Sequence, residues 1–181
     1  MAGVLVGTAL LTGCSEKQEA NDTLPSSSAA ETSEALPQLG PADFPVPDEA
    51  RTKDAAGAEA FLRYWIELID HQRAIPAGQP LRDLGLECDE CLRIAKVYDD
   101  AAAEGQRFEG GELTLNDVPS PVLNGDVATI NFGAAQSALA LVDRNGVVLE
   151  GLSAEANLPS GITLSWSPDD KVWRATGFNI G

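Results

Sequence analysis

The sequence predicts an α+β fold in which N-terminal helices pack on one face of a curved antiparallel sheet. Within residues 54–181, apolar residues recur at helical spacing in the first half and alternate with polar residues in the second. Turn signals separate the alternating segments, so consecutive strands should form hairpins, which make a sheet antiparallel. Helices followed by a run of strands indicate one layer of helices on one layer of sheet.

The clearest helical pattern begins after Asp54 and runs from about Ala55 to Arg73. Asp54 is a suitable N-cap because its carboxylate can accept hydrogen bonds from the first free amides of the helix. A stripe with two large aromatic rings needs a broad surface to cover it, such as a curved sheet. The stripe follows the helical period of 3.6 residues and consists of Ala58, Phe61, Leu62, Trp65, Ile66, Leu68 and Ile69.

Two shorter helical segments should follow. Prolines and a glycine within residues 76–80 end the first helix, and a single short turn is expected over residues 81–86. A third helix is expected over residues 89–104, and Gly105 provides its C-terminal stop. Its buried positions should be Leu92, Ala95 and Tyr98.

The strand signals begin after two consecutive glycines, Gly110 and Gly111. An unbroken apolar run over residues 138–142 predicts a central strand that is covered on both faces. Turns are expected at Asn124-Gly125 and over residues 143–146 and 167–170. The other expected strands cover residues 113–116, 128–132, 147–149, 162–166 and 172–178.

An apolar run near the N-terminus ends at Leu11-Thr12-Gly13-Cys14. The run is too short to cross a membrane as a helix, but it suits the hydrophobic part of a secretory signal peptide. Its last four residues resemble the lipobox of bacterial lipoproteins, in which a branched apolar residue and two small residues precede a modified cysteine. This resemblance implies a signal peptide over residues 1–13, cleavage after Gly13 and a diacylglyceryl thioether on Cys14. The alternative is an apolar N-terminus with an incidental cysteine.

Lipidation would place the rest of the chain outside the cytoplasm, anchored to the cell membrane through acyl chains on Cys14. Signal peptides normally begin with basic residues, and none precedes Cys14, so we expect Met1 to lie inside a longer signal. Residues 14–53 should form the lipidated cysteine and a disordered acidic tether, because they are rich in Ser, Ala, Glu, Thr and Pro. Phe44–Pro47 could dock on the single domain that follows, over residues 54–181.

The net charge of −16 disfavours two classes of partner. An acidic chain repels the phosphates of nucleic acids, so no nucleic-acid binding is expected. It also repels anionic lipid headgroups, so contact with the membrane should depend on the acyl chains.

Two cysteines, Cys88 and Cys91, lie at the start of the third helix. In a helical turn this spacing brings the Cα atoms to about 5 Å, which is within disulfide range. An even number of cysteines outside the cytoplasm also favours a disulfide. The acidic Asp89 and Glu90 between them disfavour the thiolate of a redox pair, and a zinc site would need further ligands from His71 and carboxylates. We predict a structural disulfide, with a redox pair and a metal site as the alternatives.

Residues 54–181 resemble the NTF2-like, cone-shaped fold. The shared features are a long first helix with aromatic residues, a short second helix, a third helix that runs into strands, and a closing Trp166…Trp173 hairpin. With the lipobox, the polar tether, the helix sequence over residues 57–65 and the cysteine pair, the chain also resembles a family of uncharacterised actinobacterial lipoproteins. That family carries no established activity. The NTF2-like resemblance implies a pocket between the first helix and the concave sheet, with Tyr64, Trp65 and Tyr98 as possible pocket residues.

The sequence contains no Gly-x-Ser-x-Gly, His-Glu-x-x-His or phosphate-loop signature, and we predict no catalytic residue, metal ligand or cofactor. The preferred hypothesis is a non-enzymatic cell-surface domain that binds a small molecule or a protein partner. The alternative is a pocket enzyme of isomerase or dehydratase type. Such an enzyme would need acid and base groups facing inward, for which Tyr64, Tyr98 and Asp99 are the candidates.

Three other residues have side chains that binding sites often use. His71 lies near a helix C-terminus, where we expect a surface position. Trp166 and Trp173 could line a sugar-binding face, but aromatic residues on a terminal hairpin usually belong to the core.

Overall fold

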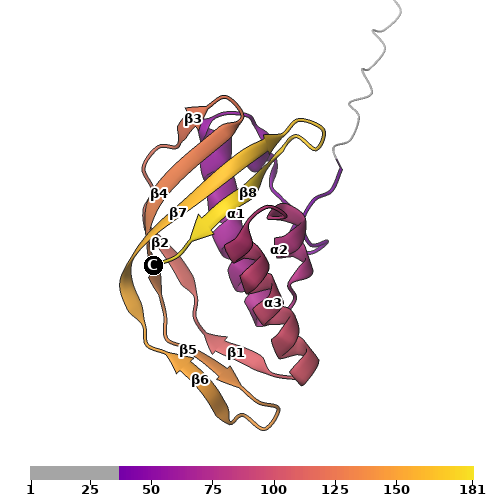
Figure 1. Cartoon of the computed structure of the whole chain (residues 1–181), viewed down its shortest axis with the longest axis vertical. Helices are drawn as coiled ribbons and strands as arrows, with labels where there is room; N and C mark the ends of the chain where they lie inside the picture. Colours follow the sequence, from indigo (N-terminus) through magenta and orange to yellow (C-terminus); the bar gives the residue numbers. More distant parts are fainter. Residues whose placement is uncertain (1–36) are drawn as a thin grey trace, which may run out of the picture. The chain divides into compact units, whose positions relative to one another are not determined.

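A computed structural model describes residues 37–181. The predicted signal peptide, the predicted lipidation site Cys14 and most of the predicted tether lie outside the described residues. Three α-helices pack against antiparallel sheets (Figure 1), which confirms the predicted α+β class.

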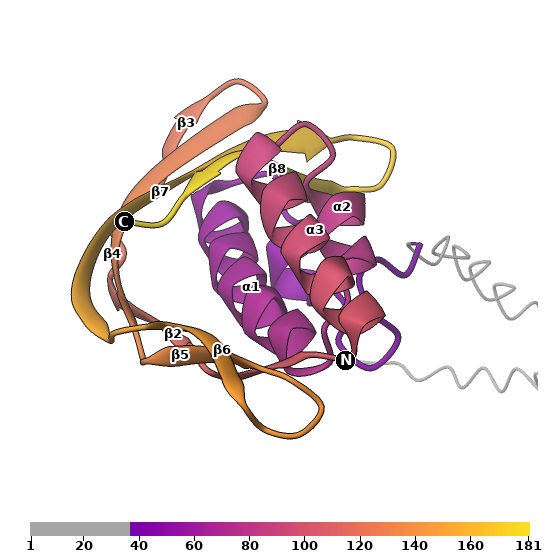
Figure 2. The same ribbon diagram turned by 60° about the horizontal axis from the view of Figure 1, so that its bottom comes forward.

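The long helix α1 (Ala55–Ala74) lies within the concave side of the curved sheets (Figure 2). It begins as predicted, because Oδ1 of Asp54 accepts a hydrogen bond of 2.7 Å from the backbone N of Gly57. Every residue of the predicted apolar stripe is buried. Among the described residues, no helix combines the length and apolar character that crossing a membrane requires.

The helices α2 (Gln79–Leu84) and α3 (Asp89–Glu104) form a second layer beside α1. α2 begins two residues before the helical turn predicted over residues 81–86. Pro80 lies at the start of α2, where the helix does not need the backbone N–H that proline lacks. α3 has its predicted bounds. It ends at Gly105, whose φ of 66° is left-handed, and an added Cβ would lie 2.1 Å from Nε of Arg144.

The larger sheet carries most of the core. Its order is β2 (Leu113–Asp117), β4 (Val127–Gln136), β7 (Glu155–Ser167) and β8 (Val172–Asn179), and β3 (Val122–Asn124) also pairs with β4. All pairs are antiparallel, as predicted. The alternation along β4 is also confirmed, because Ala128, Ile130 and Phe132 are buried.

The smaller sheet differs from the sequence-based expectation. It has the order β1 (Arg107–Gly110), β5 (Leu139–Val142) and β6 (Val148–Leu152), and the pattern did not predict β1. β5 is the middle strand, but the prediction that it is covered on both faces was wrong, because only Val142 is buried. β6 is exposed along its whole length. The reason is that this short sheet borders a cavity instead of packing fully against a helix.

The segment before α1 is part of the domain, so two expectations were wrong for residues 37–53: their disorder and the domain boundary at residue 54. A 3-10 helix (Asp48–Arg51) lies in this segment. Val46 and Ala50 are buried in the core, and Phe44 stacks on the ring of Tyr64 with 5.3 Å between centroids. The expected docking of Phe44–Pro47 is therefore observed, although the composition of the segment is polar.

Candidate functional site

A cavity of about 780 Å³ lies between α1, α3 and the inner surface of the strands. Its volume falls in the range of small-molecule sites. The apolar walls come from elements that are far apart in the sequence: Ile94 of α3, Phe108 of β1, Leu139 and Leu141 of β5, and Phe178 of β8.

Tyr98 of α3, one of the three possible pocket residues, is among the residues that line this cavity. Its hydroxyl donates a hydrogen bond of 3.3 Å to the backbone oxygen of Ile69, and its ring meets that of Phe108 edge-on at 5.4 Å. Burial raises the pKa of Tyr98 to about 12. At neutral pH the residue therefore keeps its proton, which is already used in a hydrogen bond to the backbone.

An arginine at the end of the first predicted helix, Arg73, also lines the cavity, although it was not among the predicted pocket residues. Its side chain is 8% exposed, and Nη1 donates to Oδ1 of Asp70 at 2.7 Å. The backbone N of Leu113 donates to both oxygens of Asp70, at 3.2 and 3.1 Å. Burial raises the pKa of Asp70, although Arg73 acts in the opposite direction. One feature of the sequence could have indicated that Arg73 faces inward. It lies four residues after Ile69, so it continues the apolar stripe of the helix.

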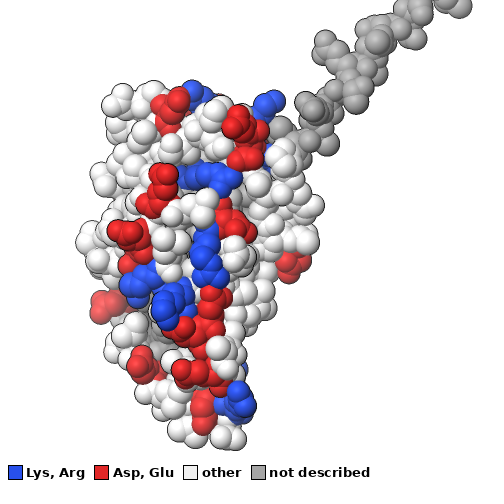
Figure 3. Space-filling view, turned by 45° about the vertical axis from the view of Figure 1, so that its right-hand side comes forward, with Lys and Arg blue, Asp and Glu red and all other residues white. Residues whose placement is uncertain are grey.

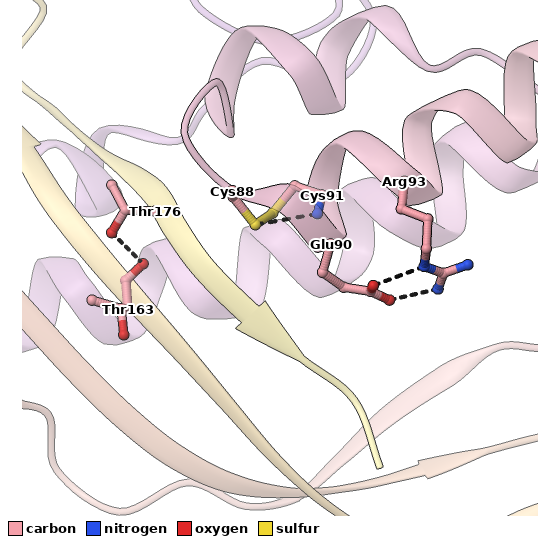
Figure 4. Close-up of a disulfide and its surroundings, with 6 residues drawn as sticks. All are labelled: Cys88, Glu90, Cys91, Arg93, Thr163 and Thr176. Atoms are coloured by element: carbon pink, nitrogen blue, oxygen red, sulfur yellow. Dashed lines mark hydrogen bonds and ion pairs between the residues drawn. A yellow bond between two sulfur atoms is a disulfide. The ribbon is translucent and has the colours of Figure 1, made fainter.

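A second acid–arginine pair lies at the edge of the cavity on α3. Nε and Nη2 of Arg93 donate to the two carboxylate oxygens of Glu90, at 2.7 and 2.5 Å (Figure 4). These hydrogen bonds lower the pKa of Glu90. The side chain of Arg93 is 63% exposed. Water therefore screens the Glu90–Arg93 pair far more than the Asp70–Arg73 pair on α1.

The predicted disulfide is present between Cys88 and Cys91, at the first turn of α3 (Figure 4). The Cα atoms are 5.2 Å apart, and both residues are buried. Sγ of Cys88 also accepts a hydrogen bond from the backbone N of Cys91. The bond therefore fixes the start of the helix that forms one wall of the cavity. Within residues 37–181, no group of three or more His, Cys, Asp or Glu residues could hold a metal ion.

The other two possible pocket residues, Tyr64 and Trp65, do not line this cavity. The hydroxyl of Tyr64 donates to the backbone oxygen of Phe44 at 3.0 Å, beneath the segment that precedes α1. Trp65 is fully buried, where its ring contacts those of Phe61 and Phe178. The expectation failed because the face of α1 that carries these residues is covered by other parts of the chain.

The acid and base candidates of the enzyme alternative lie apart. Asp99 accepts hydrogen bonds from the backbone N of Gly78 at 2.8 Å and from Nη2 of Arg82 at 2.5 Å, so it links α2 and α3. Burial acts to raise the pKa of Asp99, but these hydrogen bonds together hold it below its usual value. Tyr64, Tyr98 and Asp99 therefore each interact with a different part of the backbone.

The lone histidine and the tryptophan pair take structural positions. His71 is partly buried, stacks on Phe44 at 4.9 Å, and has Nε2 3.3 Å from a carboxylate oxygen of Asp43. Trp173 is buried, and its Nε1 donates to the backbone oxygen of Thr52 at 2.9 Å. The expected core position is confirmed for Trp173, while Trp166 is partly buried and contacts it edge-on.

Acidic and basic side chains are mixed in a band on the face shown in Figure 3. Some acid–base pairs join neighbours on one helix, such as Lys96 and Asp100 on α3, whose charged atoms are 2.5 Å apart. Exposed pairs of this kind contribute little to stability.

No family model and no curated protein matches this chain. Similar solved structures include the intermembrane space region of the chloroplast protein ARC6, with 16% identity, a TM-score of 0.49 and coverage of 71% of this chain and 97% of that one. Another, Rd1NTF2_05, has 10% identity, a TM-score of 0.43 and coverage of 69% and 96%. A domain of unknown function with a cystatin-like fold from Nostoc punctiforme has 12% identity, a TM-score of 0.41 and coverage of 69% and 76%. The α+β class of this chain follows from its own helices and antiparallel sheets.

Proposed function

We propose that the described domain is a non-enzymatic module that binds a small apolar molecule in the cavity between α1, α3 and the strands. The observation that carries this proposal is the cavity itself, about 780 Å³ in volume with largely apolar walls. Small-molecule sites typically combine apolar surface with fixed polar groups. The polar and charged side chains of these walls are those of Arg73, Glu90, Arg93, Tyr98, Gln136 and Glu150.

Binding is favoured over isomerase or dehydratase chemistry by the positions of the candidate acid and base groups. Such a reaction needs an acid and a base within hydrogen-bond reach of one substrate. Tyr64 and Asp99 do not line the cavity, and the hydroxyl of Tyr98 already donates to the backbone. The enzyme alternative therefore has one of its three residues in the cavity.

The binding proposal can be tested with N-phenyl-1-naphthylamine, a neutral apolar dye whose fluorescence rises in apolar surroundings. The wild-type protein should bind the dye, and Leu141→Trp, which fills part of the cavity, should weaken binding by roughly tenfold or more. Leu123→Trp is the matched control because Leu123 is exposed on β3 and does not line the cavity. Equal dye binding by the Leu141→Trp variant and the wild type would contradict the proposal.

We further propose that this domain belongs to a lipoprotein that is held outside the cell by acyl chains on Cys14. The resemblance of Leu11–Cys14 to a lipobox supports this location. The intact mass of protein expressed in its native membrane should include two or more acyl chains, and Cys14→Ser should remove them. The variant Cys88→Ser/Cys91→Ser should keep the acyl mass, since those cysteines form the disulfide. A wild-type protein without acyl mass would refute the anchor and leave the binding proposal in place.

A further inference from the structure

We infer that the cavity selects neutral molecules whose hydrogen-bond acceptor, the carbonyl of an ester, ketone or amide, meets the guanidinium of Arg73, and that Asp70 sets this selectivity. This inference rests on the proposed function, because it names the class of ligand that the same cavity takes.

The hydrogen-bonding capacity of Arg73 allows it to bind an acceptor atom of a ligand. A guanidinium has five N–H donors. Nη1 of Arg73 donates to Asp70, and the hydroxyl of Tyr98 is a second hydrogen-bond partner of this side chain. The side chain is only 8% exposed and lines an apolar cavity. These two partners leave N–H donors of the guanidinium for a ligand, so a ligand that brings an oxygen acceptor gains affinity over a pure hydrocarbon.

The charges around the cavity decide which acceptor fits. The charge of Arg73 is already balanced by Asp70, 2.7 Å away, and that of Arg93 is balanced by Glu90. Glu150 adds a further negative charge to the lining. A carboxylate bound to Arg73 would lie within a few ångströms of Asp70, where low polarity strengthens the repulsion between like charges.

Both negatively and positively charged ligands are disfavoured beside Arg73 and Asp70. Burial alone already raises the pKa of Asp70, so a second negative charge beside it would be more unfavourable still. An ammonium head has no lone pair, so it could not accept a hydrogen bond from the guanidinium of Arg73. The hydroxyl of Tyr98 donates its proton to Ile69, so it does not add a donor for an anion. A neutral carbonyl oxygen accepts from Arg73 without any of these penalties.

The experiment compares ligands of one chain length by their ability to displace N-phenyl-1-naphthylamine: methyl decanoate, decanoate, decylamine and decane, each below its aggregation threshold. In the wild type, methyl decanoate should bind roughly tenfold more tightly than each of the other three. In Asp70→Asn, where Arg73 has no counter-charge, decanoate should gain roughly tenfold relative to methyl decanoate.

A second variant keeps the test valid if Asp70→Asn does not fold. Asp70→Asn/Arg73→Met removes both charges together, which buried pairs tolerate better than the loss of one partner. This variant should bind methyl decanoate and decane equally. Glu59→Gln/Arg63→Met is the matched control: it removes an acid–arginine pair from the same helix, but the Arg63 side chain is 51% exposed and lies outside the cavity lining. Its ligand preferences should equal those of the wild type.

The outcomes separate the two proposals. If the wild type binds the dye and all four ligands displace it equally, the inferred selectivity is wrong and the proposed function stands. The selectivity is also wrong if the double variant at positions 70 and 73 keeps the preference for the ester, or if a folded Asp70→Asn variant does not improve decanoate binding. If the wild type binds neither the dye nor any of the ligands, the proposed function itself fails.

Discussion

At the scale of single residues, the polar atoms of two buried aromatic side chains connect the segment before α1 to the rest of the domain. The hydroxyl of Tyr64 donates to Phe44, and Nε1 of Trp173 donates to Thr52. Buried donors normally find partners of this kind. Within the described residues, two buried side-chain atoms have no hydrogen-bond partner: the donor Nε1 of Trp65 and the acceptor Oε1 of Gln72. Tyr64 and Trp173 therefore hold the segment before α1 by hydrogen bonds as well as by packing.

Tyr64→Phe tests the first of these bonds. The change keeps the ring that stacks on Phe44 and removes one buried hydrogen bond, so the free energy of unfolding should fall by about 1 kcal/mol. Urea denaturation followed by circular dichroism measures this value. An unchanged free energy of unfolding would show that the hydroxyl contributes nothing. Burial raises the pKa of Tyr64, so the measurement at neutral pH reports on the protonated hydroxyl.

At the scale of secondary-structure elements, the ends of the two long helices are fixed by local chemistry. The carboxylate of Asp54 caps α1, and Gly105 ends α3 in a left-handed conformation. At the start of α3, the disulfide and Glu90 occupy the first turn, where the helix dipole also favours a negative charge. Both helices that line the cavity therefore begin at well-defined positions.

Asp54→Ala should lower the free energy of unfolding by about 1 kcal/mol, because the amide of Gly57 loses its acceptor. Asp54→Asn is the matched control: it keeps a side-chain oxygen at the cap and removes the charge, so its loss should be smaller. Urea denaturation of both variants at neutral pH provides the comparison. Equal losses in the two variants would mean that the charge, and not the acceptor, stabilises the helix start.

The pH dependence of stability should reflect Glu90. Hydrogen bonds from Arg93 lower its pKa in the folded state below the unfolded value of 4.5. The unfolded chain therefore binds a proton first as the pH falls, so the stabilisation is present above that value and is lost as the pH drops through the lowered pKa. Glu90→Gln should flatten the fall of the melting temperature between neutral pH and about pH 3. Arg93→Gln should flatten it similarly, and an unchanged slope in both variants would argue against the pair.

At the scale of the whole domain, the strands curve around α1 (Figure 2), and the segment before α1 adds Val46 and Ala50 to the core. The larger sheet packs closely on α1, and its inward residues are buried. The smaller sheet borders the cavity beside α3 instead. The cavity thus lies where the curvature carries the strands away from the helices, and its lining combines residues from both sheets.

Two shortened chains test how much the segment before α1 contributes. A chain that starts at residue 54 loses the buried Val46 and Ala50 and the acceptor of the Trp173 indole. It should be less stable than a chain that starts at residue 37 by roughly 3 kcal/mol or more. Thermal and urea denaturation of the two chains measures the difference. Equal stability would restore the domain boundary at residue 54.

Much of the fold could be predicted from the sequence because short-range patterns carry the information. The helical period of α1, the cap at Asp54 and the turn at Asn124-Gly125 each depend on a few neighbouring residues. The candidate site could be predicted only in part, through Tyr98. Arg73 and Asp70 were missed because their partners, the cavity wall and the amide of Leu113, come from distant parts of the chain.

The sequence by itself determined the α+β class, the order of the three helices and of the strands other than β1 and β3, and the disulfide spacing, because local propensity and periodicity specify each of these. Tertiary structure alone decided that residues 37–53 join the core, that the strands divide into two sheets, and that a cavity remains beside α3. The physical reason is that burial, and with it the chemistry of Arg73, is a property of surfaces that meet only when the chain is folded.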